Sequence, residues 1–289
     1  MNGSRQAVLA EVSDRPLGVH AVRWAADEAA LRRRPLRLLH VQVGLVGAPP
    51  DTEPGSRAHS WATHLHARGE GLLREARDQA LRRHRELEVG TELASGRPAR
   101  VLREEAESAS LLVLGTPRYV GADSLFAPRD EADTLTGHLP CPVVLVREPS
   151  SGVPDDAPVV VGTDGSPSAR AAVELAFEEA FLRRVGLLAI LVRRLRDAGR
   201  TEVLEAARAS LSESLAGQGE QYPGVELRQE VVLGDPAAML ASASRRAHCL
   251  VVGAHTRGGL KKALLGSTSR TLIHGTYCPL IIASPPPAQ

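Results

Sequence analysis

The chain has 289 residues, of which 43% are hydrophobic, and its 35 basic and 34 acidic side chains give a formal net charge of +1. This length predicts about two domains of roughly 100–200 residues each. The balanced charge and an aromatic content of only 3% argue against nucleic acid as a partner, because a polyanion requires an excess of basic side chains and single strands require aromatic stacking platforms.

The sequence contains no segment typical of a membrane span or a secretion signal. The longest apolar run, residues 185–192, is much shorter than the ~20 residues of a membrane helix, and the N-terminus lacks the apolar core of a signal peptide. The three cysteines, Cys141, Cys249 and Cys278, include no CxxC pair. We therefore predict a reduced, cytoplasmic protein in which Cys141 and Cys278 are small buried thiols.

The first half of the chain predicts alternating strands and helices, with a helix followed by a strand within residues 21–41. Residues 44–60 are rich in proline and glycine, which is typical of a surface loop. The histidines near the end of this loop lack the i, i+4 spacing of a metal site. We expect them in solvent: His59, His64 and His66.

The second half of the chain repeats the first. Residues 21–41 match residues 172–192 at an offset of 151, whereas residues 141–146 match residues 278–283 at an offset of 137. The first copy therefore has about 13 extra residues, a difference typical of surface loops, and we place them within residues 44–60.

The second copy predicts five strands with helices between them. Residues 158–163 are a continuous apolar run, as expected of a parallel strand covered on both faces. Ser166 and Pro167 predict an N-cap and a proline at the first helical position, and Asp235 predicts the N-cap of a later helix. The helix after Pro167 has one apolar stripe, formed by Ala169, Ala172, Val173, Ala176, Phe177 and Ala180. The remaining strands are predicted at residues 187–192, 226–232, 249–253 and 279–283.

Strands and helices that alternate in this way predict right-handed crossovers and parallel sheets. The predicted fold class is α/β, with two tandem Rossmann-like domains at residues 1–148 and 157–284. Each is expected to hold a five-stranded parallel sheet of order 3-2-1-4-5 with helices on both faces. We expect the last strands of the two domains to pair, because apolar edge strands need to be covered.

In such sheets, ligands bind beyond the carboxyl ends of the strands, where the strand order reverses. In the second copy these ends carry Asp164 and the glycine-rich segment 253–269. Gly253, Gly258 and Gly266 permit close backbone approach and positive φ, so that amide groups converge on an anion. Gly266 is predicted to open the last helix, whose free amides and hydroxyl side chains suit a phosphate chain.

This segment resembles the ATP-binding signature of the universal stress protein family: Gly, two residues, Gly, nine residues, Gly, then Ser or Thr. Gly253, Thr256, Gly266 and Ser267 stand at these places, so a threonine replaces the second glycine. Residues 159–176 and 277–283 also resemble the family's first strand and helix and its last strand. The resemblance covers nearly the whole chain as a tandem pair and implies a fold like that of the adenine nucleotide alpha-hydrolases.

The resemblance also implies one role for each matching residue. Asp164 would hold the adenosine part, with Gly162 and Thr163 lining the same pocket, and the backbone of Val192 would meet the adenine. Val252 and Gly253 would lie near the ribose and phosphates. The phosphate chain, with or without Mg²⁺, would be held by the loop and helix residues Thr256, Arg257, Gly258, Gly266, Ser267, Thr268 and Ser269.

Simpler interpretations stay open for three of these features. Asp164 before Gly165 is also typical of a turn, and Arg257, together with Lys261 and Lys262, is also typical of a solvated surface. His255 faces either a phosphate or water.

The first copy does not have this pattern. Ser13 stands at the place of Asp164, and no Gly-Ser pair occurs in residues 115–141. Carboxylates near the start of its last helix, such as Asp130 and Asp133, would satisfy the free amides and repel a triphosphate. We therefore predict one nucleotide per chain, in the second copy.

Three functions are compatible with these features. The first, which we prefer, is an ATP-binding regulatory protein of the stress response that forms a homodimer. The second is slow ATP hydrolysis or phosphoryl transfer, for which Asp164 and His255 are the only nearby catalytic candidates and no Walker lysine motif occurs. The third is an interaction scaffold in which Thr256 has abolished nucleotide binding. We assign no catalytic or metal-binding residue.

Overall fold

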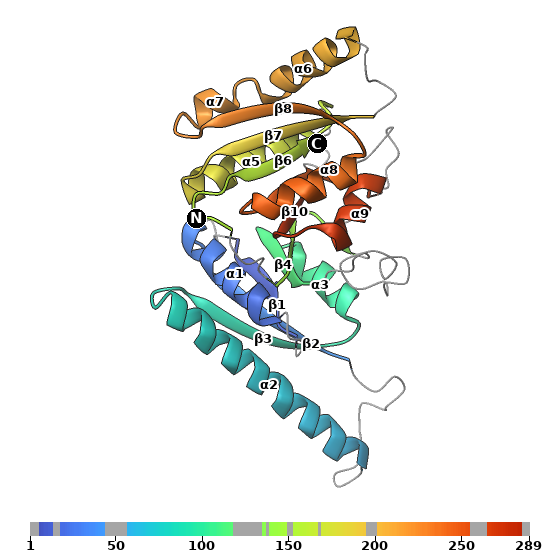
Figure 1. Cartoon of the computed structure of the whole chain (residues 1–289). Coiled ribbons are helices and arrows are strands. Elements are labelled where there is room, and N and C mark those ends of the chain that lie inside the picture. The colour runs from blue at the N-terminus through green and yellow to red at the C-terminus, as the bar shows by residue number, and fades with distance from the viewer. Residues whose placement is uncertain are drawn as a thin grey trace. The chain divides into compact units, whose positions relative to one another are not determined.

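The computed structural model describes residues 6–13, 18–43, 57–117, 135–136, 139–148, 153–166, 169–194, 201–254 and 265–284. By its internal contacts the chain divides into two compact units, Met1–Gly115 and Thr116–Gln289. Figure 1 shows a twisted sheet with packed helices in each unit.

The first unit is built on a parallel sheet. Its strands follow the order β3-β2-β1-β4, in which β1 pairs with β2 and β4, and β2 pairs with β3, all in parallel. In chain order its elements are β1 (Val8–Glu11), α1 (Gly18–Arg32), β2 (Leu36–Gln42), α2 (Arg57–Arg83), β3 (Val89–Ser95), α3 (Pro98–Ala106) and β4 (Leu111–Gly115).

The second unit contains six of the strands, in the order β5-β10-β9-β6-β7-β8. Among the described residues of this unit, the strands pair in parallel, except that β5 and β10 pair antiparallel. Its elements are β5 (Val143–Val146), β6 (Val159–Thr163), α5 (Arg170–Arg183), β7 (Leu187–Arg193), α6 (Thr201–Leu215), α7 (Gln218–Gln221), β8 (Leu227–Leu233), α8 (Pro236–Ala243), the 3₁₀ turn η4 (Ser244–Arg246), β9 (Leu250–Gly253), α9 (Ser267–Gly275) and β10 (Leu280–Ala283).

The predicted fold class is confirmed. In the second copy the strands β10-β9-β6-β7-β8 have the predicted order 3-2-1-4-5, read from the other edge. The last strands of the two copies also pair as predicted: Leu280 lies opposite Leu145, and Ile282 lies opposite Val143. β5 ends the first copy in the sequence, but it belongs by its contacts to the second unit.

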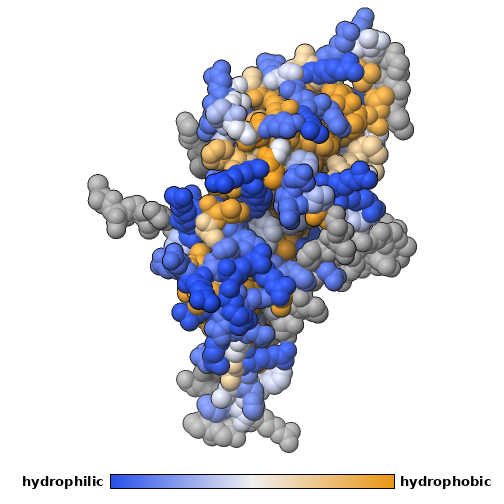
Figure 2. Space-filling model, turned by 60° about the vertical axis from the view of Figure 1, so that its left-hand side comes forward, coloured by the Kyte–Doolittle hydropathy of each residue, from blue (hydrophilic) through white to orange (hydrophobic). Residues whose placement is uncertain are grey.

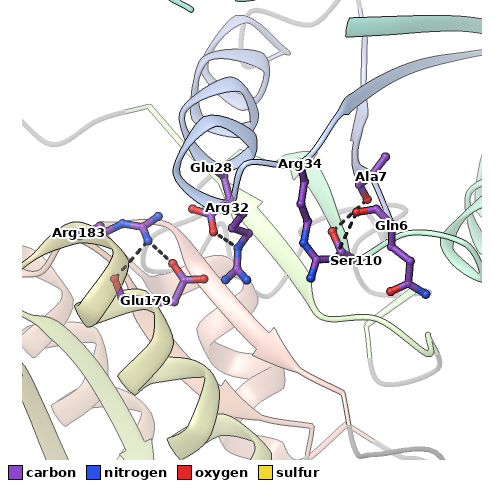
Figure 3. Close-up of polar contacts among 8 residues, drawn as sticks. All are labelled: Gln6, Ala7, Glu28, Arg32, Arg34, Ser110, Glu179 and Arg183. Atoms are coloured by element: carbon purple, nitrogen blue, oxygen red, sulfur yellow. Dashed lines mark hydrogen bonds and ion pairs between the residues drawn. The ribbon is translucent and has the colours of Figure 1, made fainter. Parts of the chain in front are cut away.

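The cores of the two units are apolar, with one repeated polar exception. The predicted stripe of α5 is buried, and Phe177 is completely inaccessible. A salt bridge between a fully buried glutamate and an arginine one turn later occurs in both copies, as Glu28–Arg32 in α1 and Glu179–Arg183 in α5. Figure 3 shows each pair on its own helix. These pairs stand at the offset of 151 that separates the copies.

One local prediction was wrong, and another lies mostly outside the described residues. Of the predicted loop 44–60, residues 44–56 lie outside the described residues, and residues 57–60 belong to α2, which has 27 residues against 15 in α6. The sequence of α2, rich in Ala, Leu, Arg and Glu, has high helix propensity and extends the element. Ser166 is not the N-cap of α5, which has Ala169 at that position without a side-chain cap; Pro167 lies outside the described residues.

The surface of α2 is strongly hydrophilic, and Figure 2 shows blue side chains over the lower part of the molecule, where this helix lies. The histidines His59, His64 and His66 are exposed on α2, as expected. In the described ranges no cluster of three or more His, Cys, Asp or Glu side chains is placed to bind a metal ion. Among the helices that the structure describes, none has the length and apolar composition of a membrane span.

Candidate functional site

The carboxyl ends of β6, β7 and β9 meet at one edge of the sheet in the second unit. Gly162 lies opposite Val252 on β9, and Thr163 lies opposite Leu191 on β7. The chain leaves β6 for α5 and leaves β9 for α9, so the strand order reverses between β6 and β9. This reversal is the position at which an open parallel sheet forms a ligand crevice.

Asp164 follows β6 and is exposed to solvent. Its Oδ1 accepts a hydrogen bond of 3.0 Å from the backbone N–H of Ser166, and the Thr163 Oγ1 accepts one of 3.1 Å from the N–H of Gly165. Gly165 has φ +76°, a conformation that favours glycine. Asp164 is therefore a turn residue, and this turn holds its carboxylate in a defined orientation beyond the carboxyl end of β6.

Gly162 is closely packed within the protein. A Cβ at this position would lie 2.6 Å from Cδ1 of Leu240, which belongs to α8, so a side chain here would have to displace Leu240. The absence of a side chain thus allows Leu240 to pack against β6.

A side-chain hydrogen bond connects the N-terminus of α9 to the end of β9. The Ser269 hydroxyl donates a hydrogen bond of 3.0 Å to the carbonyl oxygen of Gly253, and this side chain is only 5% exposed. The helix begins at Ser267 after the N-cap Gly266, as predicted, and the N–H of Arg270 bonds to the carbonyl of Gly266. The amides of the first three helical residues precede this bond and have no partner within the helix.

Two predictions about this segment need correction. Gly266 has φ −63°, and Gly253 is absent from the described residues with positive φ, so neither position requires glycine for its backbone conformation. The hydroxyl of Ser269 serves a contact inside the protein, which leaves its amide as the group it offers to a ligand.

The other predicted residues are distributed as follows. Val192 is half-buried near the end of β7, and Val252 is buried on β9. Ser267 is exposed and Thr268 is half-buried at the start of α9. The segment between β9 and α9 lies outside the described residues, and with it Thr256, Arg257, Gly258, His255, Lys261 and Lys262.

At the equivalent edge of the first unit, two groups make contacts within the protein. The carbonyl oxygen of Ser13 lies so close to α1 that a Cβ at Gly18 would be 2.5 Å from it. Gln42, at the end of β2, donates a hydrogen bond of 2.6 Å from Nε2 to the carbonyl of Leu65 in α2. The predicted carboxylates of this copy, Asp130 and Asp133, lie outside the described residues.

Arg193 is a candidate that the sequence analysis missed. It ends β7 beside Val192 and stands at the place of Gln42 in the first copy. Its Nε is buried, and no acceptor in the described part of the chain bonds to it. Side chains alternate along a strand, so Arg193 shares a face with Leu191, whose Cδ1 is 3.6 Å from the Cβ position of Gly165. The sequence contained a signal for this residue: a charged arginine ends this strand where the first copy has the neutral Gln42.

The fold defines a tandem α/β protein in which the second copy has the predicted strand order 3-2-1-4-5. The family model for the universal stress protein family matches the chain twice, at residues 5–147 and 157–284. Two similar curated proteins are the universal stress proteins Rv2005c and Rv2623 of Mycobacterium tuberculosis. The first is 34% identical over 271 residues, covering 90% of each chain, and the second is 31% identical over 300 residues, covering 97% of each.

The fold is also similar to that of a universal stress protein from Archaeoglobus fulgidus, with a TM-score of 0.70 and 17% sequence identity over 98% of this chain and 99% of that one. The chain belongs to the universal stress protein family.

Proposed function

We propose that this universal stress protein binds ATP at the crevice of its second copy and responds to the nucleotide by changing its interactions with a protein partner. The observation that carries the proposal is the bond of 3.0 Å between Ser269 and Gly253, because it holds the free amides of α9 beside the carboxyl ends of β6 and β9. Free amides at a helix N-terminus favour phosphate through hydrogen bonds and through the helix dipole.

The chemistry of the donors and acceptors fits a nucleotide. Asp164 offers an oriented, exposed carboxylate to the ribose hydroxyls or the adenine amino group. Gly162, Thr163, Val192 and Val252 offer backbone and apolar surface to the nucleoside. The amides of Ser267, Thr268 and Ser269 are the groups that we assign to the phosphates, together with the loop residues of the predicted set.

Mg²⁺ would reach this site with the triphosphate rather than alone. Phosphate oxygens and water supply most of its ligands in nucleotide sites, and the described residues of the protein form no metal-binding cluster. We assign no residue of the chain to the metal.

One nucleotide per chain is part of the proposal. In the first copy, Ser13 replaces the carboxylate, and its carbonyl oxygen packs against Gly18 where the second copy has a turn. Homodimer formation and a cytoplasmic location also belong to the proposal; sedimentation of the intact chain and fractionation of cells that express it would test them.

The test is isothermal titration of the intact chain with ATP. We expect one site per chain, and Asp164→Ala should weaken binding by about tenfold or more, because hydrogen bonds to a charged group contribute ~1.5–3 kcal/mol. The matched control is Ser13→Ala, at the same place in the first copy, which should leave the affinity unchanged. Absence of binding at millimolar ATP would refute the proposal and favour an interaction scaffold.

A further inference from the structure

A buried arginine near the end of the first copy contacts the last helix of the second copy. Arg147 directly follows β5 and belongs by its contacts to the second unit, together with α9. It is only 4% exposed. Its Nη2 donates a hydrogen bond to the carbonyl oxygen of Ile273 and lies 3.5 Å from that of Leu272. The first copy thus supplies a side chain to the helix whose N-terminus we assign to the phosphates.

The end of α9 provides the acceptors that a buried guanidinium group requires. Leu272 and Ile273 lie in the last turn of the helix, where carbonyl oxygens lack donors within the helix and form the negative end of its dipole. A cation removed from water is costly unless such acceptors bind it. Arg147 and the C-terminal end of α9 therefore stabilise each other.

The helix α9 is short and is held near both ends. It has nine residues, so it is roughly 13 Å long at 1.5 Å per residue. Near its N-terminus, Ser269 bonds to the carbonyl of Gly253, and Arg147 bonds to the backbone near its C-terminus. The side chains of Leu272 and Ile273 are completely buried and fix the face that the helix turns to the core. The bond from Arg147 to the helix end opposes a shift of α9 along its axis, which would also move the free amides of its first turn.

The equivalent residue of the second copy has a different role. Ser284 stands at the place of Arg147, at the offset of 137 that relates the last strands of the two copies. Its hydroxyl donates a hydrogen bond of 2.6 Å to the carbonyl of Cys141, which precedes β5. Of these two equivalent positions, only the one that contacts α9 carries a cation.

We propose that Arg147 is a positioning residue of the nucleotide site, supplied by the first copy; this inference rests on the proposed function. Arg147 holds the C-terminal end of α9, and the helix transmits this constraint to the amides that receive the phosphates. Binding groups need to be held within about 0.5 Å of the productive geometry, so a small displacement of α9 weakens their bonds to phosphate. The first copy therefore contributes to nucleotide affinity without binding a nucleotide itself.

The experiment is isothermal titration of the full chain with ATP, comparing wild type with Arg147→Met, which keeps an apolar side chain of similar length and removes the donors. We expect about fivefold weaker binding, because displaced amides lose part of their hydrogen bonds to the charged phosphates. Arg147→Lys keeps the charge and a donor group, so it should recover part of this loss. Thermal melts define a titration temperature at which each variant is folded.

The matched control is Arg183→Met. Arg183 ends α5 and pairs with the fully buried Glu179 on the same helix, so this substitution destabilises the second unit through α5 rather than through α9. We expect the ATP affinity of the wild type in this variant. The control separates a general loss of stability from a displacement of α9.

Two outcomes would overturn this inference while the proposed function stands. The first is wild-type ATP affinity in the folded Arg147→Met chain. The second is an equal loss of ATP affinity in Arg147→Met and Arg183→Met, which would show that Arg147 acts only through stability. Absence of ATP binding by the wild-type chain would instead refute the proposed function, and this inference with it.

Discussion

Arg193 carries a positive charge at a place where part of its guanidinium group is removed from water. Its buried Nε has no acceptor within the described residues, whereas Gln42, its counterpart in the first copy, is bonded to the carbonyl of Leu65. A buried N–H donor without an acceptor costs free energy, and an anionic ligand nearby would reduce that cost. Under the proposed function, Arg193 is therefore a further residue that we expect to favour the nucleotide.

Replacing Arg193 should therefore affect binding more than stability. We expect Arg193→Ala to weaken ATP binding by about tenfold, which corresponds to ~1.4 kcal/mol. Gln42→Ala should leave ATP binding unchanged and should lower the free energy of unfolding by ~1 kcal/mol, because it removes a hydrogen bond within the protein. Titration and chemical unfolding of both variants measure these effects; equal ATP affinity in Arg193→Ala and wild type would contradict the assignment.

Cys278 should make the protein less stable in alkali. Burial raises the pKa of its thiol from 9.0 to about 12, against an opposing effect of the Arg147 charge. Between these values the unfolded chain loses the thiol proton and the folded chain keeps it, so the free energy of unfolding falls as the pH rises from about 9 to about 12. Unfolding curves at several pH values should show a smaller decline for Cys278→Ala. The same decline in both proteins would mean that other groups cause it.

At the scale of the element, the two copies begin equivalent helices with different caps. Asp235 caps α8 by accepting a hydrogen bond of 3.0 Å from the N–H of Ala238, as predicted from the sequence. Arg97 occupies the same position before α3, with nearly the same backbone angles and a proline following, but makes no side-chain cap. The backbone before α3 therefore has the conformation of a capped helix start, but the Arg97 side chain does not cap the helix.

Substitutions at these two positions should change the free energy of unfolding in opposite directions. Asp235→Ala should lower the free energy of unfolding by ~0.5–2 kcal/mol, and Arg97→Asp should raise it by ~0.5–1 kcal/mol, because an N-cap carboxylate satisfies a free amide of the first turn. Urea unfolding of the two variants tests both signs. A loss of stability in Arg97→Asp would show that the backbone match between the copies is insufficient.

Other elements show which local signals were reliable. The apolar runs predicted the strands of the second copy to within two residues, and helical spacing predicted the buried stripe of α5. Ser166 is not the N-cap of α5 because it belongs to the turn after β6: its N–H bonds to Asp164, and its carbonyl accepts from the N–H of Ala169, which stands at the N-cap position. A serine followed by a proline is typical of a helix start, but that pattern does not exclude a competing turn.

At the scale of the whole molecule, duplication has preserved a costly polar feature. Glu28 and Glu179 are both fully buried, and each pairs with an arginine one turn later, Arg32 or Arg183. Burial removes both charges of a pair from water, so loss of one partner removes an attraction that offsets the cost of burying the other charge. The two copies therefore share this buried ion pair as well as the order of their strands.

Both arginines should be strongly required for stability. We expect Arg32→Met and Arg183→Met each to lower the free energy of unfolding by ~3–5 kcal/mol, because each removes a cationic partner of a fully buried carboxylate. Arg170→Met is the matched control, since it breaks an exposed pair of the same i, i+4 spacing and should cost less than ~1 kcal/mol. Chemical unfolding measures all three, and a similar cost for Arg170→Met would show that burial is not the cause.

By itself, the sequence determined the repeat, the strands and helices of the second copy, the family and the edge of the sheet at which a ligand is expected. These follow from local periodicity and from spacing along the chain, which a single sequence contains in full.

Only the tertiary structure decided which groups at that edge are already used by the protein. The Ser269 hydroxyl bonds to a carbonyl 16 residues away, and Leu240 of α8 packs against the Cβ position of Gly162. These relations depend on contacts between distant segments, and one sequence carries no local pattern that specifies them.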